Sequence, residues 1–466
     1  MKFTLTRPQL AAAAAALATF AGLLGSSFAA SAAVTAEEAR QLGTTLTRFG
    51  AIKAGNKDGS IPDYTGTPIK IPADYKPGSG FYTDPFRDEK PLYRIDAKNV
   101  DQHADKLSEG QKRLLKTQPS TYYIDVYPTH RTETYPDKVL KAGERNLTTC
   151  TAQKDYTVLD VACRGGLPFV IPKNGYEVIW NMITRWQGDG QVIVMGQRGW
   201  LVDSGGRPTL TAEQFTRQEK PYYQLEQADR DPAMLMRTYS ITRAPSRLSG
   251  VGTGIVDYLD MDQKPRRAWT YTPGQRRVKL APEFAYDTPV ASLGGATLFD
   301  ELWLFSGKMD RFDFKLVGKK EMLLPYNNYK LISGCKGEAK LQAKHIDPAC
   351  DRYELHRVWV VEATLKPGQR HVYSKRTYYI DEDGYGAGMF DAWDQSGNLY
   401  RSMFNMNMPF YDHDFVYAGS SVIYDFNKNM YLMVGDQSHG GIRYSPTPMS
   451  ERDMAPDATM VRESVR

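Results

Sequence analysis

From Gln191 onward, apolar and polar residues alternate along much of the chain with a period of two, which is the pattern of strands with one buried face. Val192 and Val194 alternate with polar neighbours, and Trp359 and Val361 share one face of a later stretch. Turn sequences return at intervals of about a strand plus a turn: Ser204-Gly205-Gly206, Pro273-Gly274, Pro367-Gly368, Asp383-Gly384, Ser396-Gly397 and Asn427-Lys428-Asn429. This order predicts an antiparallel meander.

The clearest helical pattern begins at Asn174, which has Glu177 three residues later, and it ends before Gly188. Four apolar residues recur in it at helical spacing, namely Tyr176, Ile179, Trp180 and Ile183. A helix with one strongly apolar face is expected to pack on a sheet. We therefore expect this helix to lie against the concave side of the predicted meander.

Residues 34–120 are predicted to be a loop-rich segment with short helices, ahead of a β-domain over 121–466. Thr35 and Ser108 each stand three residues before a Glu or Gln, so they predict helices that run to about Leu42 and to before Pro119. Between these helices, glycine and proline recur too often for a regular element. A strand is predicted over 122–127, where it is stopped by a proline.

The first 33 residues differ from the rest of the chain. Lys2 and Arg7 precede the apolar run from Leu10 to Leu24, and small residues fill positions 29–33. That order predicts a cleaved secretory signal peptide. The run is shorter than the roughly 20 residues that a membrane span needs, and no second run follows, so we expect a protein that does not span the membrane.

The four cysteines form two pairs that are close in sequence, Cys150 with Cys163 and Cys335 with Cys350. Export to an oxidising compartment predicts a local disulfide in each pair. Neither pair has the short spacing of a zinc knuckle, so a zinc site is disfavoured.

Composition excludes several classes of protein. Of the 466 residues, 41% are hydrophobic and 24% are charged, unlike a disordered, collagen-like or multi-span membrane protein. Lys plus Arg number 59 and Asp plus Glu 54, so the bulk charge demands neither nucleic acid nor an acidic partner. The 12% of aromatic residues suit either a filled core or the wall of a cavity.

One sequence is similar to the nucleophile loop of chymotrypsin-like serine proteases, Asp203-Ser204-Gly205-Gly206. The earlier histidines, His103 and His130, lack the flanking residues that this mechanism needs, and no Gly-x-Ser-x-Gly elbow is present. A hairpin turn explains the same residues. We predict no catalytic residue and no enzymatic activity.

A small group of carboxylates could suggest glycoside hydrolysis, which uses a pair of acids. The group comprises Asp300, Glu301, Asp310 and Asp313. Basic residues nearby offer ion-pair partners, namely Lys308, Arg311 and Lys315. A structural role in ion pairs is therefore favoured.

Two further groups contain residues that can bind metals. Met403, Met406 and Met408 have the thioethers that copper(I) accepts, but no histidine or cysteine adjoins them, so packing is favoured. Asp412-His413-Asp414 offers three ligands, but alternate residues of a strand point to opposite faces, so a surface position is favoured. We predict no metal site and no cofactor.

A basic stretch runs from Lys264 to Lys279 without one acidic residue, and it is interleaved with Trp269 and Tyr271. Its other basic residues are Arg266, Arg267, Arg276 and Arg277. Nucleic acid and anionic lipid headgroups are possible partners for such a stretch. An outward strand face whose acidic partners come from elsewhere is favoured, and no nucleic-acid partner is predicted.

Several longer strings resemble the bacterial family of unknown function catalogued as DUF1329. The first group is Phe49-Gly50-Ala51, the run from Ala54 to Pro62, Gly165-Gly166-Leu167-Pro168-Phe169, Ile171-Pro172-Lys173-Asn174-Gly175 and Trp180-Asn181. The second group is the runs 273–278, 281–289, 310–313, 317–322 and 325–329. Together they cover nearly the whole chain after the predicted signal peptide.

The resemblance implies an α+β fold in which a large curved antiparallel sheet, a half-barrel like that of the lipoprotein carriers LolA and LolB, is covered by a few helices. It implies a periplasmic protein that acts with an exporter of the resistance-nodulation-division type or with an outer-membrane protein. Three positions depart from the family pattern, with Tyr64, Val170 and Met182 in place of tryptophan, proline and histidine.

Two hypotheses follow. The first is a non-enzymatic binder or carrier of a hydrophobic, lipid-like ligand. Its candidate wall residues are Trp180, Met182, Trp269, Tyr271, Trp303, Phe305 and Trp359. The second is an adaptor that docks to an exporter or outer-membrane protein through its surface.

Overall fold

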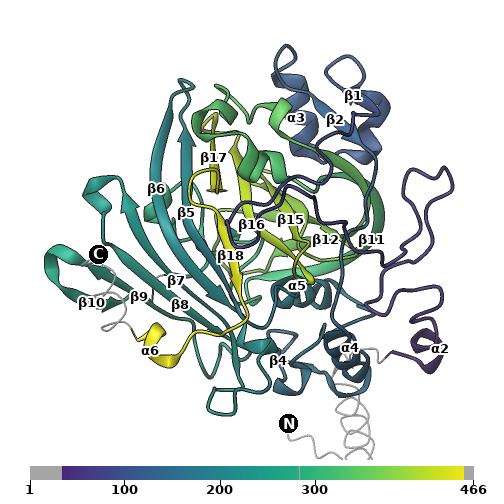
Figure 1. Cartoon of the computed structure of the whole chain (residues 1–466), viewed down its shortest axis with the longest axis vertical. Helices are drawn as coiled ribbons and strands as arrows, with labels where there is room; N and C mark the ends of the chain where they lie inside the picture. Colours follow the sequence, from purple (N-terminus) through teal and green to yellow (C-terminus); the bar gives the residue numbers. More distant parts are fainter. Residues whose placement is uncertain (1–33, 283, 456–466) are drawn as a thin grey trace, which may run out of the picture. The chain divides into compact units, whose positions relative to one another are not determined.

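The computed structural model describes residues 34–282 and 284–455 (Figure 1), so the predicted signal peptide lies outside the described residues. In this part of the chain, 16 strands form one large sheet, and β3 and β4 form a separate pair. The strands are β1 (Tyr93–Ile95), β2 (Ile124–Tyr127), β3 (Ala152–Gln153), β4 (Val158–Leu159), β5 (Gln191–Val202), β6 (Pro208–Glu219), β7 (Met234–Ala244), β8 (Gly252–Tyr258), β9 (Arg267–Thr272), β10 (Arg277–Leu280), β11 (Phe312–Pro325), β12 (Tyr353–Leu365), β13 (Lys375–Asp381), β14 (Gly388–Trp393), β15 (Leu399–Phe410), β16 (Phe415–Asp425), β17 (Met430–Asp436) and β18 (Ile442–Ser445).

The helices are few and mostly short. The α-helices are α2 (Ala36–Ala39), α3 (Glu109–Thr117), α4 (Asp137–Thr149), α5 (Gly175–Thr184) and α6 (Glu451–Met454). The single-turn and other short helices are η1 (Val100–Lys106), η2 (Val161–Cys163), η3 (Pro221–Tyr223), η4 (Ser246–Leu248), η5 (Pro273–Gln275), η6 (Ala291–Leu293), η7 (Phe299–Glu301), η8 (Lys330–Gly334), η9 (Gly337–Lys340) and η10 (Pro348–Cys350).

The large sheet is almost entirely antiparallel and does not close on itself. Its order is β1-β2-β12-β13-β14-β15-β16-β17-β5-β6-β7-β8-β9-β10, with β11 paired to β12 and β18 to β5. Only β2 runs parallel to its neighbour β12 among the described strands. Figure 1 shows β5–β9 side by side as a curved part of the sheet. The predicted α+β class and the antiparallel meander are confirmed.

Local sequence signals explain where two helices begin. At the start of α3, Ser108 and Gln111 form the predicted capping box. The carboxylate of Asp391 on β14 accepts further hydrogen bonds from the first backbone N–H groups of this helix, at 2.8 and 3.0 Å. The predicted capping box at Thr35 is also present, but α2 ends at Ala39, before the predicted Leu42.

The sequence did not predict α4. No side chain caps the N-terminus of this helix, because Pro136 occupies the capping position. Its Gly143 allows a close helix-to-loop approach, since a methyl group added at Gly166 would lie 2.2 Å from the Gly143 nitrogen. Packing against a distant segment therefore forms this helix without the usual sequence signal.

The predicted helix 174–187 is found as α5, which packs on β11 and β12. Asn174 caps it, because its side chain accepts a hydrogen bond from the backbone N–H of Glu177 at 3.0 Å. The helix ends at Thr184, three residues earlier than predicted, because the backbone of Arg185 leaves the helical conformation, with φ −35° and ψ 144°. The indole of Trp186 then donates to the backbone carbonyl of Asp414.

Both predicted disulfides are present, Cys150 to Cys163 and Cys335 to Cys350. Disulfides persist in oxidising compartments, so they point to a protein that works outside the cytoplasm. Within the described ranges, no helix combines the length and the apolar character needed to cross a bilayer.

Candidate functional site

A cavity of about 640 Å³ lies against strands β5–β9. Residues 284–303, here called the cover segment, form its opposite wall, and they include η6 and η7. Tyr417 on β16 and Val434 on β17 also line it. A volume of this size falls within the range of about 300–1,000 Å³ that is usual for small-molecule sites.

The strand side of the cavity carries a row of four hydroxyl groups. Thr216, Ser240, Thr253 and Thr270 line the cavity from β6, β7, β8 and β9. They are consecutive register partners, so they stand directly opposite one another across four strands. We call them the polar row. Cross-strand Thr and Ser pairs of this kind hydrogen-bond to each other.

Hydrogen bonds extend the polar row onto β5. The hydroxyls of Thr216 and Ser240 are 2.9 Å apart, and Gln197 Nε2 donates to Thr216 Oγ1 at 3.0 Å. Gln214 Nε2 and Thr242 Oγ1 make a parallel contact at 3.4 Å. The strand side of the cavity is therefore a hydrogen-bonded polar surface with sites for further polar groups.

The cover segment is mainly apolar where it faces the cavity. Its apolar lining residues are Phe284, Pro289, Val290, Ala291, Leu293, Phe299, Leu302 and Trp303. The rings of Phe284 and Phe299 stack with their centroids 4.3 Å apart. Leu293 reaches the sheet at Gly199, where an added methyl group would lie 2.9 Å from Leu293 Cδ2. The cavity therefore has a mainly apolar wall opposite the polar row, although Val194 and Ile255 also line the strand side.

Buried ion pairs hold the cover segment to the sheet. Arg266 pairs with Asp257 on β8 at 2.6 Å, and it also donates to the Phe284 carbonyl at 3.0 Å and to Ser306 Oγ at 2.6 Å. One arginine therefore ties the start of the cover segment, and the chain just after its end, to the strands beneath it.

Two acids near the end of the cover segment make further pairs. Asp300 binds Arg376 at 2.5 Å and His371 at 3.0 Å. Burial alone would raise the pKa of Asp300, but the charge of Arg376 and the hydrogen bond from His371 outweigh it, so the pKa lies well below its usual value. Glu301 binds Arg401 at 3.1 Å. These acids have the structural role that the sequence predicts, although their partners are distant in sequence.

Among the described residues that line the cavity, one has a charged side chain, Arg247. It lies on η4, in the connection between β7 and β8, and is exposed. A cation at the edge of a cavity with polar and apolar walls favours a ligand with an anionic or strongly polar end.

Of the predicted ligand-binding residues, Trp303 lines the cavity. Together with Phe305 it also borders a smaller space of about 20 Å³ between the cover segment, β6 and β7. Trp269 and Tyr271 flank Thr270 on β9, and they belong to a cluster on the other face of the sheet. Trp269 lies flat on Gly254, where an added methyl group would come within 2.2 Å of its ring.

The remaining predicted residues do not line this cavity. Trp180 and Met182 are buried in α5, and the Trp180 indole donates to the Tyr156 carbonyl at 2.7 Å. Trp359 lies on β12, where the Lys319 ammonium is 4.1 Å from the centre of its ring.

The residues of the polar row were missed by the sequence analysis. A usable signal was present, because Thr238, Ser240 and Thr242 alternate with Tyr239 and Ile241 along β7. The polar positions of such a strand are normally assigned to solvent. Here the cover segment encloses the polar face, while Met449 and Met454 pack on the apolar one.

A second cavity, of about 610 Å³, has a different chemical character. It lies between residues 81–91 and the region of η8, and its lining includes Asp84, Arg87, Glu89, Lys90, Lys330, Asp351 and Arg352. Acidic and basic groups alternate on its wall, and several are paired, as Arg352 is with Glu89 at 2.6 Å. It is less suited to an apolar ligand than the cavity under the cover segment.

The other groups that the sequence raised have structural roles. Asp203 Oδ1 accepts backbone hydrogen bonds from Gly205 and Arg207 in the hairpin between β5 and β6. The three methionines of β15 are fully buried: Met403, Met406 and Met408. In the turn after β15, Asp412 accepts hydrogen bonds from Tyr75 and Tyr82.

The chain matches a family model, described as a protein of unknown function, DUF1329, over residues 94–459. It belongs to the DUF1329 family. An uncharacterized protein of Pseudomonas aeruginosa is 39% identical to it over 441 residues, which are 93% of this chain and 95% of that protein. The family resemblance noted in the sequence is confirmed.

Two solved structures are similar to this DUF1329 member over 61% of its chain. A DUF1329 family protein from Desulfovibrio piger is 14% identical, with a TM-score of 0.40 and 97% of that chain covered. A LolA superfamily protein from Nitrosomonas europaea is 8% identical, with a TM-score of 0.35 and 99% of that chain covered.

Proposed function

We propose that this DUF1329 member is a periplasmic, non-catalytic carrier of an amphiphilic, lipid-like molecule. The observation that supports it is the cavity of about 640 Å³ with one hydroxyl-lined wall and one apolar wall. A buried polar surface is costly unless it is hydrogen-bonded, and an apolar one gains from contact with an apolar ligand. The best occupant has an apolar face for the cover segment and polar groups for the polar row.

The polar row distinguishes such a ligand from a plain acyl chain. A chain of methylene groups would leave the hydroxyls of Thr253 and Thr270 without a partner from the ligand. A hydroxylated or otherwise polar-substituted amphiphile would hydrogen-bond to them, and an anionic end would approach Arg247. Delivery to an exporter or outer-membrane protein remains an expectation from the family resemblance.

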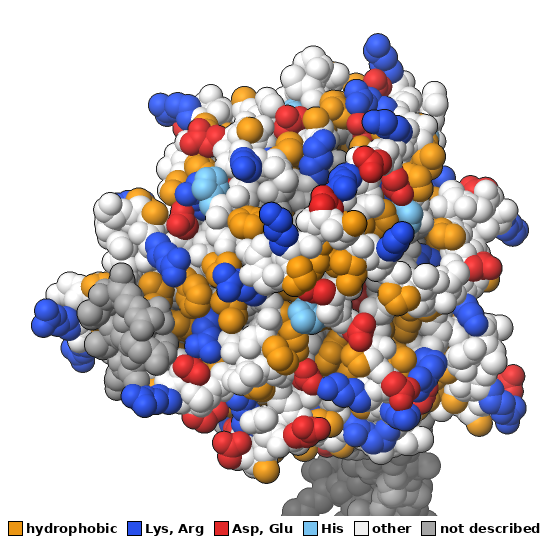
Figure 2. All heavy atoms as spheres, viewed as in Figure 1, with side chains coloured by type: hydrophobic (Ala, Val, Ile, Leu, Met, Phe, Trp, Pro, Cys, Tyr) orange, Lys and Arg blue, Asp and Glu red, His pale blue; other side chains and the backbone are white. Residues whose placement is uncertain are grey.

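The adaptor hypothesis has less support. It rests on the basic stretch 264–279 and on the loop-rich N-terminal segment. In the basic stretch, Lys264 pairs with Asp231 at 2.6 Å and Arg266 is buried against Asp257. On the face drawn in Figure 2, basic and acidic side chains are interspersed. Two of the six cations of this stretch are thus engaged in ion pairs, and the other four, Arg267, Arg276, Arg277 and Lys279, are exposed.

The experiment that tests the proposal is ligand recovery from protein exported to a bacterial periplasm. Organic extraction followed by mass spectrometry should recover an amphiphile in a fixed ratio to protein, and a fluorescent fatty acid should bind in competition with it. Failure to recover a ligand, together with failure to bind the probe, would refute the carrier.

A cavity-filling variant locates the binding. Ser240→Phe places a ring in the polar row and should abolish probe binding, whereas Ser249→Phe, on an exposed turn, should leave it unchanged. Equal binding by both variants would show that the probe binds elsewhere.

A further inference from the structure

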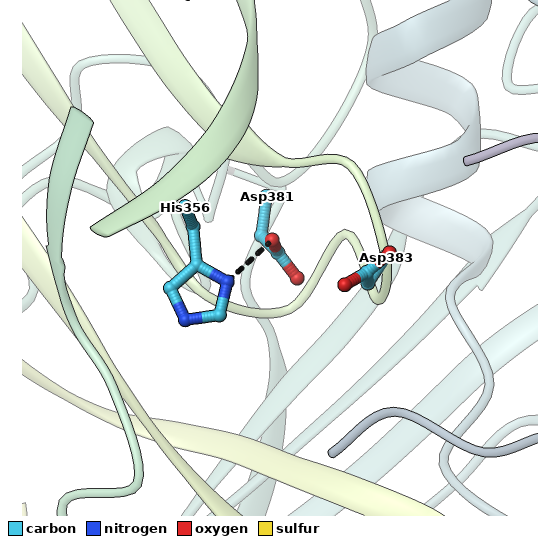
Figure 3. Close-up of side chains that lie close together, drawn as sticks. All are labelled: His356, Asp381 and Asp383. Carbon is cyan, nitrogen blue, oxygen red and sulfur yellow. Dashed lines mark ion pairs between the residues drawn. The ribbon is translucent and has the colours of Figure 1, made fainter. Parts of the chain in front are cut away.

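A separate cluster of ligating side chains lies where β12 meets the turn between β13 and β14. His356 is on β12, Asp381 ends β13, and Asp383 lies in the turn. One imidazole nitrogen and one oxygen of each carboxylate lie within 4.8 Å of one another, and all three side chains are buried. Figure 3 shows the imidazole facing Asp381, with Asp383 beside it. We call these residues the His356 cluster.

Asp381 has one oxygen that the protein leaves unsatisfied. Its Oδ2 accepts hydrogen bonds from the Tyr326 hydroxyl at 3.1 Å and from the Gly384 backbone at 3.0 Å. Its Oδ1 is buried and accepts no hydrogen bond from the described residues. That oxygen is 3.7 Å from His356 Nδ1, which is too long for a hydrogen bond. This separation is close to the distance between two ligand atoms that each lie about 2.0–2.2 Å from one shared metal ion.

The other side of the imidazole has the contact that metal-binding histidines usually make. His356 Nε2 lies 3.3 Å from Glu354 Oε2. Glu354 is held as an acceptor, because Arg352 donates to its other oxygen at 2.7 Å. In the tautomer that donates from Nε2 to Glu354, the Nδ1 lone pair faces Asp381. A carboxylate behind the imidazole orients a metal-binding histidine and raises its basicity.

The residues around Asp383 leave its carboxylate able to bind a cation. Arg131 binds both oxygens of Asp383, at 2.6 and 2.8 Å, and each oxygen keeps a free lone pair. Glu133 packs on the same turn, since a methyl group added at Gly384 would lie 2.2 Å from its Oε2. A further buried carboxylate therefore lies beside the turn that holds Asp383.

We propose that His356, Asp381 and Asp383 bind a divalent first-row transition-metal ion, with Zn²⁺ as the best match. One imidazole nitrogen with carboxylate oxygens is a ligand set that Zn²⁺ accepts in tetrahedral geometry. Ca²⁺ prefers six to eight oxygens, so it fits less well.

The ion would connect the sheet to the N-terminal segment. Arg131, which holds Asp383, also donates to the Ile52 carbonyl at 2.8 Å, and Arg357 donates to the Ala54 carbonyl at 2.7 Å. Removing the ion should therefore loosen residues 52–54 from β12 and the β13–β14 turn. The site is distinct from the cavity, so it is tested independently of the carrier function.

Because the cluster is buried, the test loads the ion during folding. The disulfide-intact protein is unfolded in guanidinium, refolded with EDTA or with Zn²⁺, and desalted, and its metal is measured by mass spectrometry. We expect about one Zn²⁺ per chain, a higher melting temperature than the EDTA-refolded protein and slower proteolysis near residue 53. No retained Zn²⁺ in the wild-type protein would overturn the proposal.

Variants then assign the ligands. His356→Gln and Asp381→Asn should each weaken Zn²⁺ binding by at least ~100-fold. Mutating a residue that only hydrogen-bonds to a metal ligand typically costs about 10–100-fold in affinity, and losing the ligand itself should cost more. The matched control is His413→Gln, which removes a surface imidazole near Asp412. If His356→Gln and Asp381→Asn retain as much Zn²⁺ as the wild-type protein, or if only the control loses it, the site is refuted. If neither variant folds, X-ray absorption of the wild-type ion decides, because sulfur ligands or several imidazoles would also refute it.

Discussion

The hydroxyls of Thr216 and Ser240 face each other across β6 and β7 at 2.9 Å, on the wall of the cavity. A strand face covered by protein is usually apolar, so an enclosed row of hydroxyls is a specific feature. It makes the chemistry of the ligand testable, because polar groups on the ligand should be required for tight binding.

The first prediction concerns this polar row. In Thr253→Val/Thr270→Val, affinity for a hydroxylated amphiphile such as deoxycholate should fall about tenfold relative to palmitate, which corresponds to one lost hydrogen bond of about 1.4 kcal/mol. Competition against a fluorescent fatty acid measures both affinities. Thr209→Val, at the exposed end of β6, is the control. An unchanged ratio of the two affinities would contradict a role for the row.

A second prediction concerns the attachment of the cover segment. Arg266→Gln removes the side chain that holds Phe284 and Ser306, and it leaves Asp257 buried without its partner. We expect a stability loss of about 3–5 kcal/mol and faster ligand dissociation, because the cover segment loses its attachment at Phe284. Stopped-flow dissociation and chemical unfolding measure the two effects.

The control for that variant is its neighbour, Arg267→Gln. Arg267 is exposed on β9, so this change should alter neither quantity by much. If Arg266→Gln lowers stability and leaves the dissociation rate unchanged, the cover segment does not gate the cavity.

A third prediction separates α5 from the cavity. Trp180 is buried in the core, so Trp180→Ala should cost about 3–5 kcal/mol of stability and leave ligand affinity intact. Trp303→Ala should instead weaken ligand binding, because Trp303 lines the cavity. Melting and binding measured on both variants test this contrast. If Trp180→Ala binds the ligand more weakly at temperatures where the variant is fully folded, α5 contributes to the binding site.

The fourth prediction is a pH dependence that arises from Asp300. The folded state lowers the pKa of this carboxyl, so its ion pair with Arg376 stabilises the protein above the unfolded pKa of about 3.9. Asp300→Asn should cost about 3–5 kcal/mol at neutral pH. The difference from wild type should shrink as the pH falls below about 4, because wild-type Asp300 is then protonated on unfolding.

Unfolding in urea between pH 3 and pH 7 measures this difference. Asp313→Asn is the control, since Asp313 is largely exposed and its contact with Lys366 is 3.8 Å long, so its contribution should be small at every pH. A difference between Asp300→Asn and wild type that does not change with pH would contradict the assignment.

Much of the fold follows from short-range features of the sequence. The turns between β12 and β17, the capping boxes at Thr35 and Ser108, and the pairing of cysteines 13 and 15 residues apart all depend on neighbours along the chain. Local conformational preferences and short loop closures act before any long-range contact forms. The sequence alone therefore predicted the antiparallel meander, α3, α5 and both disulfides, and its longer motifs identified the family.

The tertiary structure alone decided which strand face became the site. Alternation along β9 separates Thr270 from Trp269 and Tyr271, but it does not say which face will be enclosed. That depends on the cover segment and on Met449, which come from distant parts of the chain. The same holds for Asp300 with Arg376 and for His356 with Asp381, because residues far apart in sequence meet only through strand register and packing.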